Sequence, residues 1–143
     1  MAIKNYTSEV SIEKSMANIE KYLVSAGARN IMKEYNDLGA CTSISFAIIS
    51  NGSTIVFNIP SRLDLISKKM MAKYIRPTDK SHALVREQAG RTAWKIISDW
   101  VEIQVTMIML DQAEMKQLFL AYMYDGKETF YDKFERSDFK QLK

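Results

Sequence analysis

Apolar residues first recur with helical spacing between residues 12 and 26. They follow one another at intervals of four, three, four and three residues: Ile12, Met16, Ile19, Leu23 and Ala26. This spacing places them on one face of a helix. Ser11 offers a side-chain oxygen to the free amides of the first turn, and Gly27 provides the left-handed residue that commonly ends a helix. The segment is therefore predicted to form one amphipathic helix.

The spacing changes from helical to alternating after this helix. Alternation of apolar and polar side chains is typical of strands. It predicts a strand over residues 30–35 and two more at these apolar positions: Ile44, Phe46 and Ile48, then Ile55, Phe57 and Ile59. Asn51-Gly52 lies between the last two strands and suits a type I′ turn, because both central residues need positive φ. Asn36-Asp-Leu-Gly39 is typical of a turn, and Pro60 ends the third strand because it lacks an amide donor.

Helical patterns fill the rest of the chain. Ser61 and Asp64 resemble a capping box at the start of a short helix, which Arg76-Pro77 interrupts. A long helix follows from about Ser81 to Leu110, and its apolar residues cover half of its circumference. We expect it to pack also on the last helix or on another subunit, since one sheet usually covers less. A further helix is predicted over 113–122, and a short extended or helical tail over 129–134.

These elements predict a single α+β domain spanning residues 1–143. Its sheet is small and mostly antiparallel, a three-stranded meander with an N-terminal edge strand at Ile3 to Thr7, and helices, including the long C-terminal helix, cover it. A chain of 143 residues has the length of one domain and buries enough surface to fold without a disulfide or metal.

Composition limits the partners of this domain. The net charge of +3 is small, and the 20 basic residues are dispersed among 17 acidic ones, so we do not expect a nucleic acid partner. The single cysteine, Cys41, selects no oxidising compartment. The chain has neither a signal-peptide pattern nor an apolar run long enough to span a membrane, which predicts a cytoplasmic protein without a membrane partner.

Catalytic and metal-binding patterns are missing from the sequence. His82 is the only histidine, so no metal-binding Cys/His cluster can form, and nothing marks it as a neighbour of Cys41. Motifs for phosphate loops, dinucleotide binding and serine hydrolases do not occur. Acidic pairs such as Asp99 and Glu102 are explained as surface charge. We therefore expect a binding protein without a cofactor, a metal or catalytic residues.

The long helix carries a group of cations and rings with binding potential. Cations beside aromatic faces can hold phosphates while a base stacks alongside. The group comprises Arg86, Arg91, Trp94 and Lys95. Trp100 lies in the middle of the apolar arc and is assigned to the core, whereas Trp94 lies at its edge. Arg86 and Gln104 project toward the centre of the apolar face, so their partners must come from a helix–helix interface, a subunit interface or a ligand pocket.

A second group of candidate residues lies at the chain start and at the exit of the sheet. Loops and termini commonly carry ligand contacts, and the residues here are Asn5, Tyr6, Thr7 and Arg62. We assign phosphate contacts to the basic residues Arg62, Arg86, Arg91 and Lys95. Tyr6 or Trp94 is the expected stacking partner of a base. The aromatic C-terminal third is expected to pack on its own core or on a neighbouring subunit.

Short motifs along nearly the whole chain resemble a widespread set of small tailed-phage and prophage proteins. They are Asn5-Tyr-Thr, Gly27-Ala-Arg-Asn-Ile-Met32, Glu34-Tyr35, Ile44-Ser-Phe46, Phe57-Asn-Ile-Pro60, Arg86-Glu-Gln-Ala89, Arg91-Thr-Ala-Trp94, Asp99-Trp100 and Phe119-Leu-Ala-Tyr122. The chain is similar in character to the anti-CBASS sponge family, but the ligand residues of that family do not map individually onto this sequence.

This resemblance implies an immune-evasion protein in the host cell cytoplasm. Members of the sponge family form homo-oligomers and sequester cyclic dinucleotides such as cyclic GMP-AMP without cleaving them. For this chain it implies a cyclic nucleotide ligand and a dimer or tetramer. Two alternatives remain open: a phage interaction module that inhibits a host protein, and a nucleic-acid-binding accessory protein.

Overall fold

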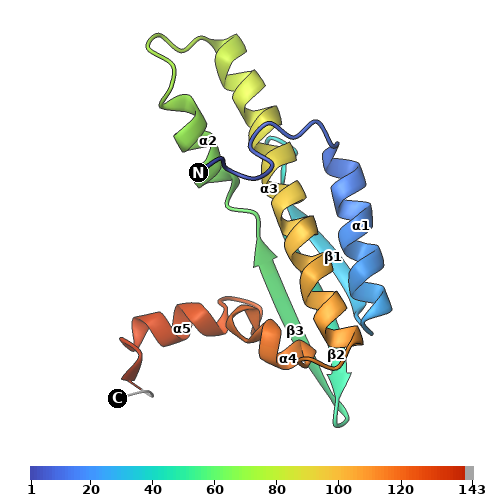
Figure 1. The fold of residues 1–143 in the computed structure, drawn as a ribbon. Coiled ribbons are helices and arrows are strands. Elements are labelled where there is room, and N and C mark those ends of the chain that lie inside the picture. The colour runs from blue at the N-terminus through green and yellow to red at the C-terminus, as the bar shows by residue number, and fades with distance from the viewer. Residues whose placement is uncertain (141–143) are drawn as a thin grey trace.

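The computed structural model describes residues 1–140, in which two long helices lie across one face of a three-stranded sheet (Figure 1). The elements are α1 (Ile12–Ser25), β1 (Arg29–Tyr35), β2 (Cys41–Ser50), β3 (Ser53–Pro60), α2 (Leu63–Met71), α3 (Asp79–Met109), α4 (Met115–Leu118), the 3₁₀ helix η1 (Leu120–Tyr122) and α5 (Phe130–Arg136). The α+β class and the antiparallel meander are as predicted.

The hairpin of β2 and β3 determines which side chains face the helices. Asn51 and Gly52 have φ angles of 53° and 80°, as a type I′ turn requires. The resulting register pairs Phe46 with Phe57, and each of these residues is fully buried. Because successive side chains of a strand point to opposite faces, the alternating isoleucines of both strands join these rings under the helices.

An aromatic cluster joins the sheet to the helices. The rings of Phe46 and Phe57 stack with centroids 5.1 Å apart, and Phe119 meets Phe46 edge-on at 5.5 Å. Trp100 of α3 lies edge-on to Phe119 at 5.2 Å. Aromatic pairs with this geometry contribute about 1 kcal/mol beyond the area that they bury. The cluster therefore holds the segment after α3 against the sheet.

The long helix α3 is apolar around much of its circumference because three partners cover it. It packs against α1 and α2, and Trp100 packs on the segment after it. Trp94 is fully buried, and its Nε1 donates a hydrogen bond to the Cys41 carbonyl at 3.3 Å, whereas Trp100 is half-buried. The prediction that Trp100 is the more deeply buried of the two tryptophans is thus wrong. A helical wheel that assumes one buried face does not identify the more buried tryptophan, because α3 is covered from several directions.

Three local predictions are wrong. The predicted edge strand over residues 3–7 is not formed: residues 4–7 form a turn, in which the Tyr6 amide donates to the Ile3 carbonyl at 3.3 Å. No capping box opens α2, because Arg62 adopts the left-handed conformation (φ 55°) at the position before the helix. The predicted helix over 113–122 is divided into α4 and η1.

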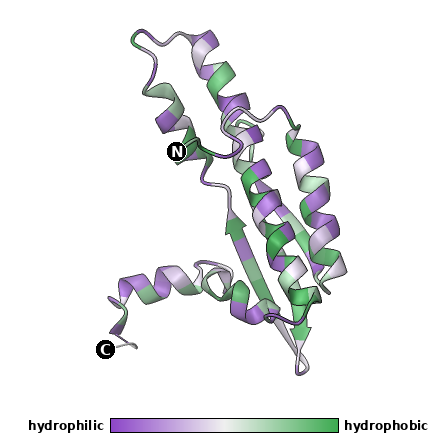
Figure 2. Cartoon of the chain, in the orientation of Figure 1, coloured by the Kyte–Doolittle hydropathy of each residue, from purple (hydrophilic) through white to green (hydrophobic). Residues whose placement is uncertain are grey.

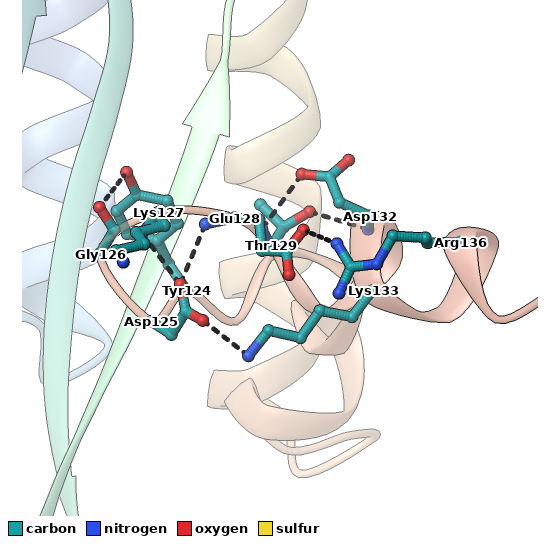
Figure 3. Close-up of polar contacts among 9 residues, drawn as sticks. All are labelled: Tyr124, Asp125, Gly126, Lys127, Glu128, Thr129, Asp132, Lys133 and Arg136. Carbon is teal, nitrogen blue, oxygen red and sulfur yellow. Dashed lines mark hydrogen bonds and ion pairs between the residues drawn. The ribbon is translucent and has the colours of Figure 1, made fainter.

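The last described segment, residues 123–140, forms a C-terminal arm that leaves the domain beside β3 (Figure 1). Its start pairs with β3, since the Tyr124 amide donates to the Val56 carbonyl at 2.8 Å. Its charges pair within the arm: Asp125 with Lys133, and Glu128 with Arg136 (Figure 3). Apolar colouring is concentrated on the strands and the central helices, and α5 is mixed (Figure 2). Beyond this pairing, α5 of the arm packs against η1.

Candidate functional site

The first ten residues form an N-terminal strap (residues 1–10) that is bonded to α3. Gln88 holds it, because its Nε2 lies 3.1 Å from the carbonyl oxygen of Tyr6 and 3.1 Å from that of Ser8. The Thr92 hydroxyl donates to the same Tyr6 carbonyl at 3.0 Å. One side-chain amide thus satisfies two carbonyls that lack a place in a sheet or helix. These bonds hold the strap against α3, which it crosses before α1 begins (Figure 1).

Asp99 binds the strap at the residues that directly precede Tyr6. Its carboxylate accepts hydrogen bonds from Asn5 Nδ2 at 2.8 Å and from Lys95 Nζ at 2.6 Å, and Lys4 lies 3.6 Å away. Burial would raise the pKa of Asp99, but the bonds from Lys95 and Asn5 and the nearby positive charge outweigh it and hold the pKa below its usual value. Asn5 and Lys95, two predicted ligand contacts, therefore have an anionic partner within the chain.

The strap, α2 and α3 enclose the first candidate site, which we call the Tyr6 pocket. It has a volume of about 330 Å³. It is lined by Tyr6, Thr7, Met70, Lys73, Tyr74, Leu84, Val85, Gln88 and Arg91. Its apolar floor continues a small core cluster of Met70, Val85 and Ala89, on which Tyr6 packs. The floor keeps the Tyr6 ring in place at the edge of the pocket.

The Tyr6 pocket combines positive charge with aromatic rings. Lys73 Nζ lies 4.5 Å from the centroid of the Tyr6 ring, which is the geometry of a cation–π contact. One guanidinium nitrogen of Arg91 donates a hydrogen bond to Gln88 Oε1 at 2.7 Å. The lining residues include two cations, two tyrosines and no carboxylate. Such a surface attracts an anion that also carries a ring.

A larger second cavity, which we call the Arg62 cavity, lies between the β1–β2 turn, α2 and α3. Its volume is about 610 Å³. It is lined by Ile12, Asn36, Leu38, Gly39, Ala40, Thr42, Pro60, Ser61, Arg62, Leu63, Asp64, Ser67, Ala83, Arg86 and Glu87. The Arg62 guanidinium contacts Asp64 through two bonds of 3.4 Å, and this lowers the pKa of Asp64. Two cations and two carboxylates therefore share this cavity.

The structure distributes the eight predicted site residues over four places. Tyr6, Thr7 and Arg91 line the Tyr6 pocket; Arg62 and Arg86 line the Arg62 cavity; Asn5 and Lys95 bind Asp99; and Trp94 is in the core. The assignment of Trp94 as a stacking partner is wrong because its ring is fully buried. Arg86 is exposed, so its predicted projection into the apolar face is also wrong.

Three lining residues of the Tyr6 pocket that carry polar groups are not predicted from the sequence: Lys73, Tyr74 and Gln88. Tyr74 lies beyond the end of α2 at Met71, and it is 42% exposed. The only available signal was the Lys-Tyr pair just before the Arg76-Pro77 break, because chain ends of helices commonly reach ligands.

The described part of the chain shows no cluster for metal binding. No group of three or more His, Cys, Asp or Glu side chains lies together within residues 1–140. Cys41 is buried, and burial raises the pKa of its thiol, whereas His82 is exposed on α3. A thiol with a raised pKa is a poor nucleophile at neutral pH.

Comparisons with known proteins do not place the chain in a family. No protein-family model matches it, and neither a curated protein nor a solved structure is significantly similar to it. Within residues 1–140, none of the helices combines the length and the apolar character that crossing a bilayer would take.

Proposed function

We propose that this chain captures a phosphate-bearing nucleotide in the Tyr6 pocket and holds it without chemical change. The observation that carries the proposal is the meeting of two cations and two tyrosines in one cavity whose lining contains no carboxylate. Following the resemblance to the sponge family, we propose a cyclic nucleotide immune signal as the ligand. The biological role would then be sequestration of that signal.

The cations of the pocket have donors to offer a phosphate. Arg91 gives one bond to Gln88 and carries five N–H donors in total, so a ligand oxygen can use those that remain. Lys73 is exposed, and the contact found for its ammonium group within residues 1–140 is with the face of the Tyr6 ring. An anion can displace that contact at small cost. Charge-assisted hydrogen bonds to phosphate are about twice as strong as neutral ones.

The tyrosines supply surfaces for a base. Tyr6 is half-buried on the Met70 cluster and Tyr74 is partly exposed, so each ring presents a face or an edge to the pocket. Stacking of a base on an aromatic side chain contributes about 1–3 kcal/mol. A ring ligand without a phosphate, or a phosphate without a ring, would use only half of the groups in the pocket.

The size of the pocket limits the ligand. A volume of about 330 Å³ lies near the lower end of the range for small-molecule sites. We therefore propose that one nucleotide unit enters it and that the second unit of a cyclic dinucleotide extends toward solvent. Sequestration would then need a second copy of the chain to cover that unit, and the proposed homo-oligomer fits this need.

The chemistry of the lining supports binding over catalysis. Neither histidine, cysteine nor a carboxylate is among the residues that line the pocket, so it offers no usual general base. Hydrolysis of a phosphodiester without a metal would require at least such a base. A captured nucleotide is thus expected to leave the protein intact after denaturation.

Calorimetry against a panel of cyclic dinucleotides, cyclic trinucleotides, AMP and cyclic ADP-ribose isomers tests the proposal. We expect saturable heat with at least one cyclic nucleotide, and a loss of about tenfold or more in affinity for Arg91→Gln and for Lys73→Gln. Arg76→Gln is the matched control, since Arg76 is exposed nearby but does not line the pocket. Absence of heat with every ligand, or equal effects of all three variants, would refute the site.

Exposed rings on the C-terminal arm favour one alternative, a module that binds and inhibits a host protein. Phe130 and Tyr131 are 37% and 47% exposed, although rings of this size are usually buried. Capture from host lysate with the unchanged chain and with Phe130→Ser/Tyr131→Ser separates the two functions. A stoichiometric host protein that only the unchanged chain retains would favour inhibition over sequestration.

A further inference from the structure

The Arg62 cavity is distinct from the Tyr6 pocket, and its chemistry is different. Its two cations are accompanied by two carboxylates, Asp64 and Glu87, so the lining is balanced in charge. An anionic nucleotide would meet repulsion from the carboxylates as well as attraction from the arginines. The ligand of this cavity is therefore expected to carry both signs of charge or neither.

Two of the four charged groups are free to bind a ligand. Arg62 and Asp64 already contact one another at 3.4 Å. Arg86 and Glu87, adjacent on α3, take part in none of the hydrogen bonds and ion pairs found within residues 1–140, and both line the cavity. A free guanidinium is suited to a carboxylate and a free carboxylate to an ammonium group. Arg86 and Glu87 therefore place opposite charges side by side at the α3 edge of the Arg62 cavity.

The rest of the lining provides an apolar floor. Several segments contribute apolar side chains, among them Ile12 of α1, Leu38 of the β1–β2 turn, Leu63 of α2 and Ala83 of α3. Leu38 is 75% exposed, although a leucine gains about 2 kcal/mol from full burial. A ligand with an apolar body would cover it. The volume of about 610 Å³ lies within the range of small-molecule sites.

The backbone conformation of Arg62 is a further feature of this cavity. Arg62 has a left-handed conformation with φ of 55°, which costs a residue other than glycine about 1–2 kcal/mol. This conformation lets the chain turn from β3 into α2, and both Arg62 and Leu63 line the cavity. Strained residues of this kind are often found at ligand-binding sites.

We infer that the Arg62 cavity binds a small zwitterion with an apolar body, of the class of an apolar dipeptide with free termini. Its carboxylate binds Arg86, its ammonium group binds Glu87, and its side chains cover Leu38 and the floor. Asp64 and Arg62, which hold one another only through long and exposed contacts, can rearrange toward the ligand at little cost.

Calorimetry with leucyl-leucine tests this inference, with three capped forms as comparisons: N-acetylated, C-amidated and doubly capped. We expect the free dipeptide to bind and each single cap to weaken binding by about tenfold, because each removes one charge-assisted contact. Arg86→Gln should lose sensitivity to the amide cap alone, and Glu87→Gln to the acetyl cap alone. Decanoate, an apolar anion without an ammonium group, should bind more weakly than the dipeptide.

Controls separate this inference from the proposed function. Arg91→Gln should leave dipeptide binding unchanged, and Arg86→Gln should leave nucleotide binding unchanged, because the two sites share no lining residue. Ala83→Phe, which fills the cavity from an exposed helical position, should abolish dipeptide binding without unfolding the chain. Absence of dipeptide binding, insensitivity to both caps, or tighter binding of decanoate would each overturn the inference.

Discussion

Replacement of Gln88 tests how the Tyr6 pocket is assembled. The side chain of Gln88 donates to the carbonyls of Tyr6 and Ser8 and accepts from Arg91. A hydrogen bond of this kind contributes about 1 kcal/mol net. Gln88→Ala removes the two strap bonds, so docking of the strap should weaken by about 2 kcal/mol. The Thr92 hydroxyl still holds Tyr6 at 3.0 Å and limits the loss.

The expected effect on the strap is larger than that on the whole domain. A loss of about 2 kcal/mol corresponds to a rise of about thirtyfold in the population of the detached strap. Amide hydrogen exchange in the N-terminal peptide should accelerate by that factor in Gln88→Ala. The free energy of global unfolding should fall by no more than the free energy of strap docking. The reason is that no residue of the strap belongs to the core formed by α1, α3 and the sheet.

Gln88→Glu distinguishes the role of Gln88 in holding the strap from its role in binding Arg91. The variant keeps an acceptor for Arg91 but presents a carboxylate oxygen to the carbonyls of Tyr6 and Ser8, where the amide nitrogen lies now. Exchange of the strap should therefore be at least as fast as in Gln88→Ala, although the contact to Arg91 is retained. If both variants leave exchange within about threefold of the unchanged chain, or if glutamate restores protection, the assigned role of Gln88 is wrong.

Three further predictions concern stability. Phe119→Ala should cost about 3–5 kcal/mol in denaturant unfolding, because the ring is fully buried among three aromatic partners; a cost below about 1 kcal/mol would contradict the packing. Ser15→Ala should stabilise the chain by about 1 kcal/mol, since the Ser15 hydroxyl is buried and has no partner within residues 1–140, and a lower melting temperature would refute this. A hydrogen bond to Glu102, burial and nearby negative charge raise the pKa of Tyr22 to about 12 from 10.0. The unfolded tyrosine loses its proton first, so this stabilisation is complete below pH 10 and is lost as the pH rises toward 12. The difference in stability between the unchanged chain and Tyr22→Phe should fall over that window, and a constant difference would count against the bond.

Local patterns in the sequence were enough to predict most of the fold. The start of α1 shows this directly, since Ser11 Oγ accepts from the Lys14 amide at 3.1 Å as an N-cap residue should. The β2–β3 turn was predictable for a similar reason, because a positive φ at Asn51 and Gly52 depends on those two residues more than on their surroundings. Where one face of an element meets one partner, periodicity identifies the buried side correctly.

The candidate site was predictable only in part. Tyr6, Thr7 and Arg91 were identified by residue type and position, but Lys73, Tyr74 and Gln88 join them through the packing of α2 and the strap on α3. The contact of the strap with α3 joins residues about 80 apart in the sequence, such as Tyr6 and Gln88. Neither the spacing of apolar residues nor the secondary-structure propensity of a segment predicts a contact between residues so far apart in the sequence.

The amino-acid order thus specifies the helices, the meander and the turn, because backbone preferences and one-sided burial act within a few residues. Burial of Trp94 instead of Trp100, the left-handed start of α2 at Arg62, and the path of the strap depend on how distant segments share space. Partners that cover α3 from several sides determine which of its side chains remain accessible to a ligand. The two cavities, with their different balance of charge, exist only once those segments have packed together.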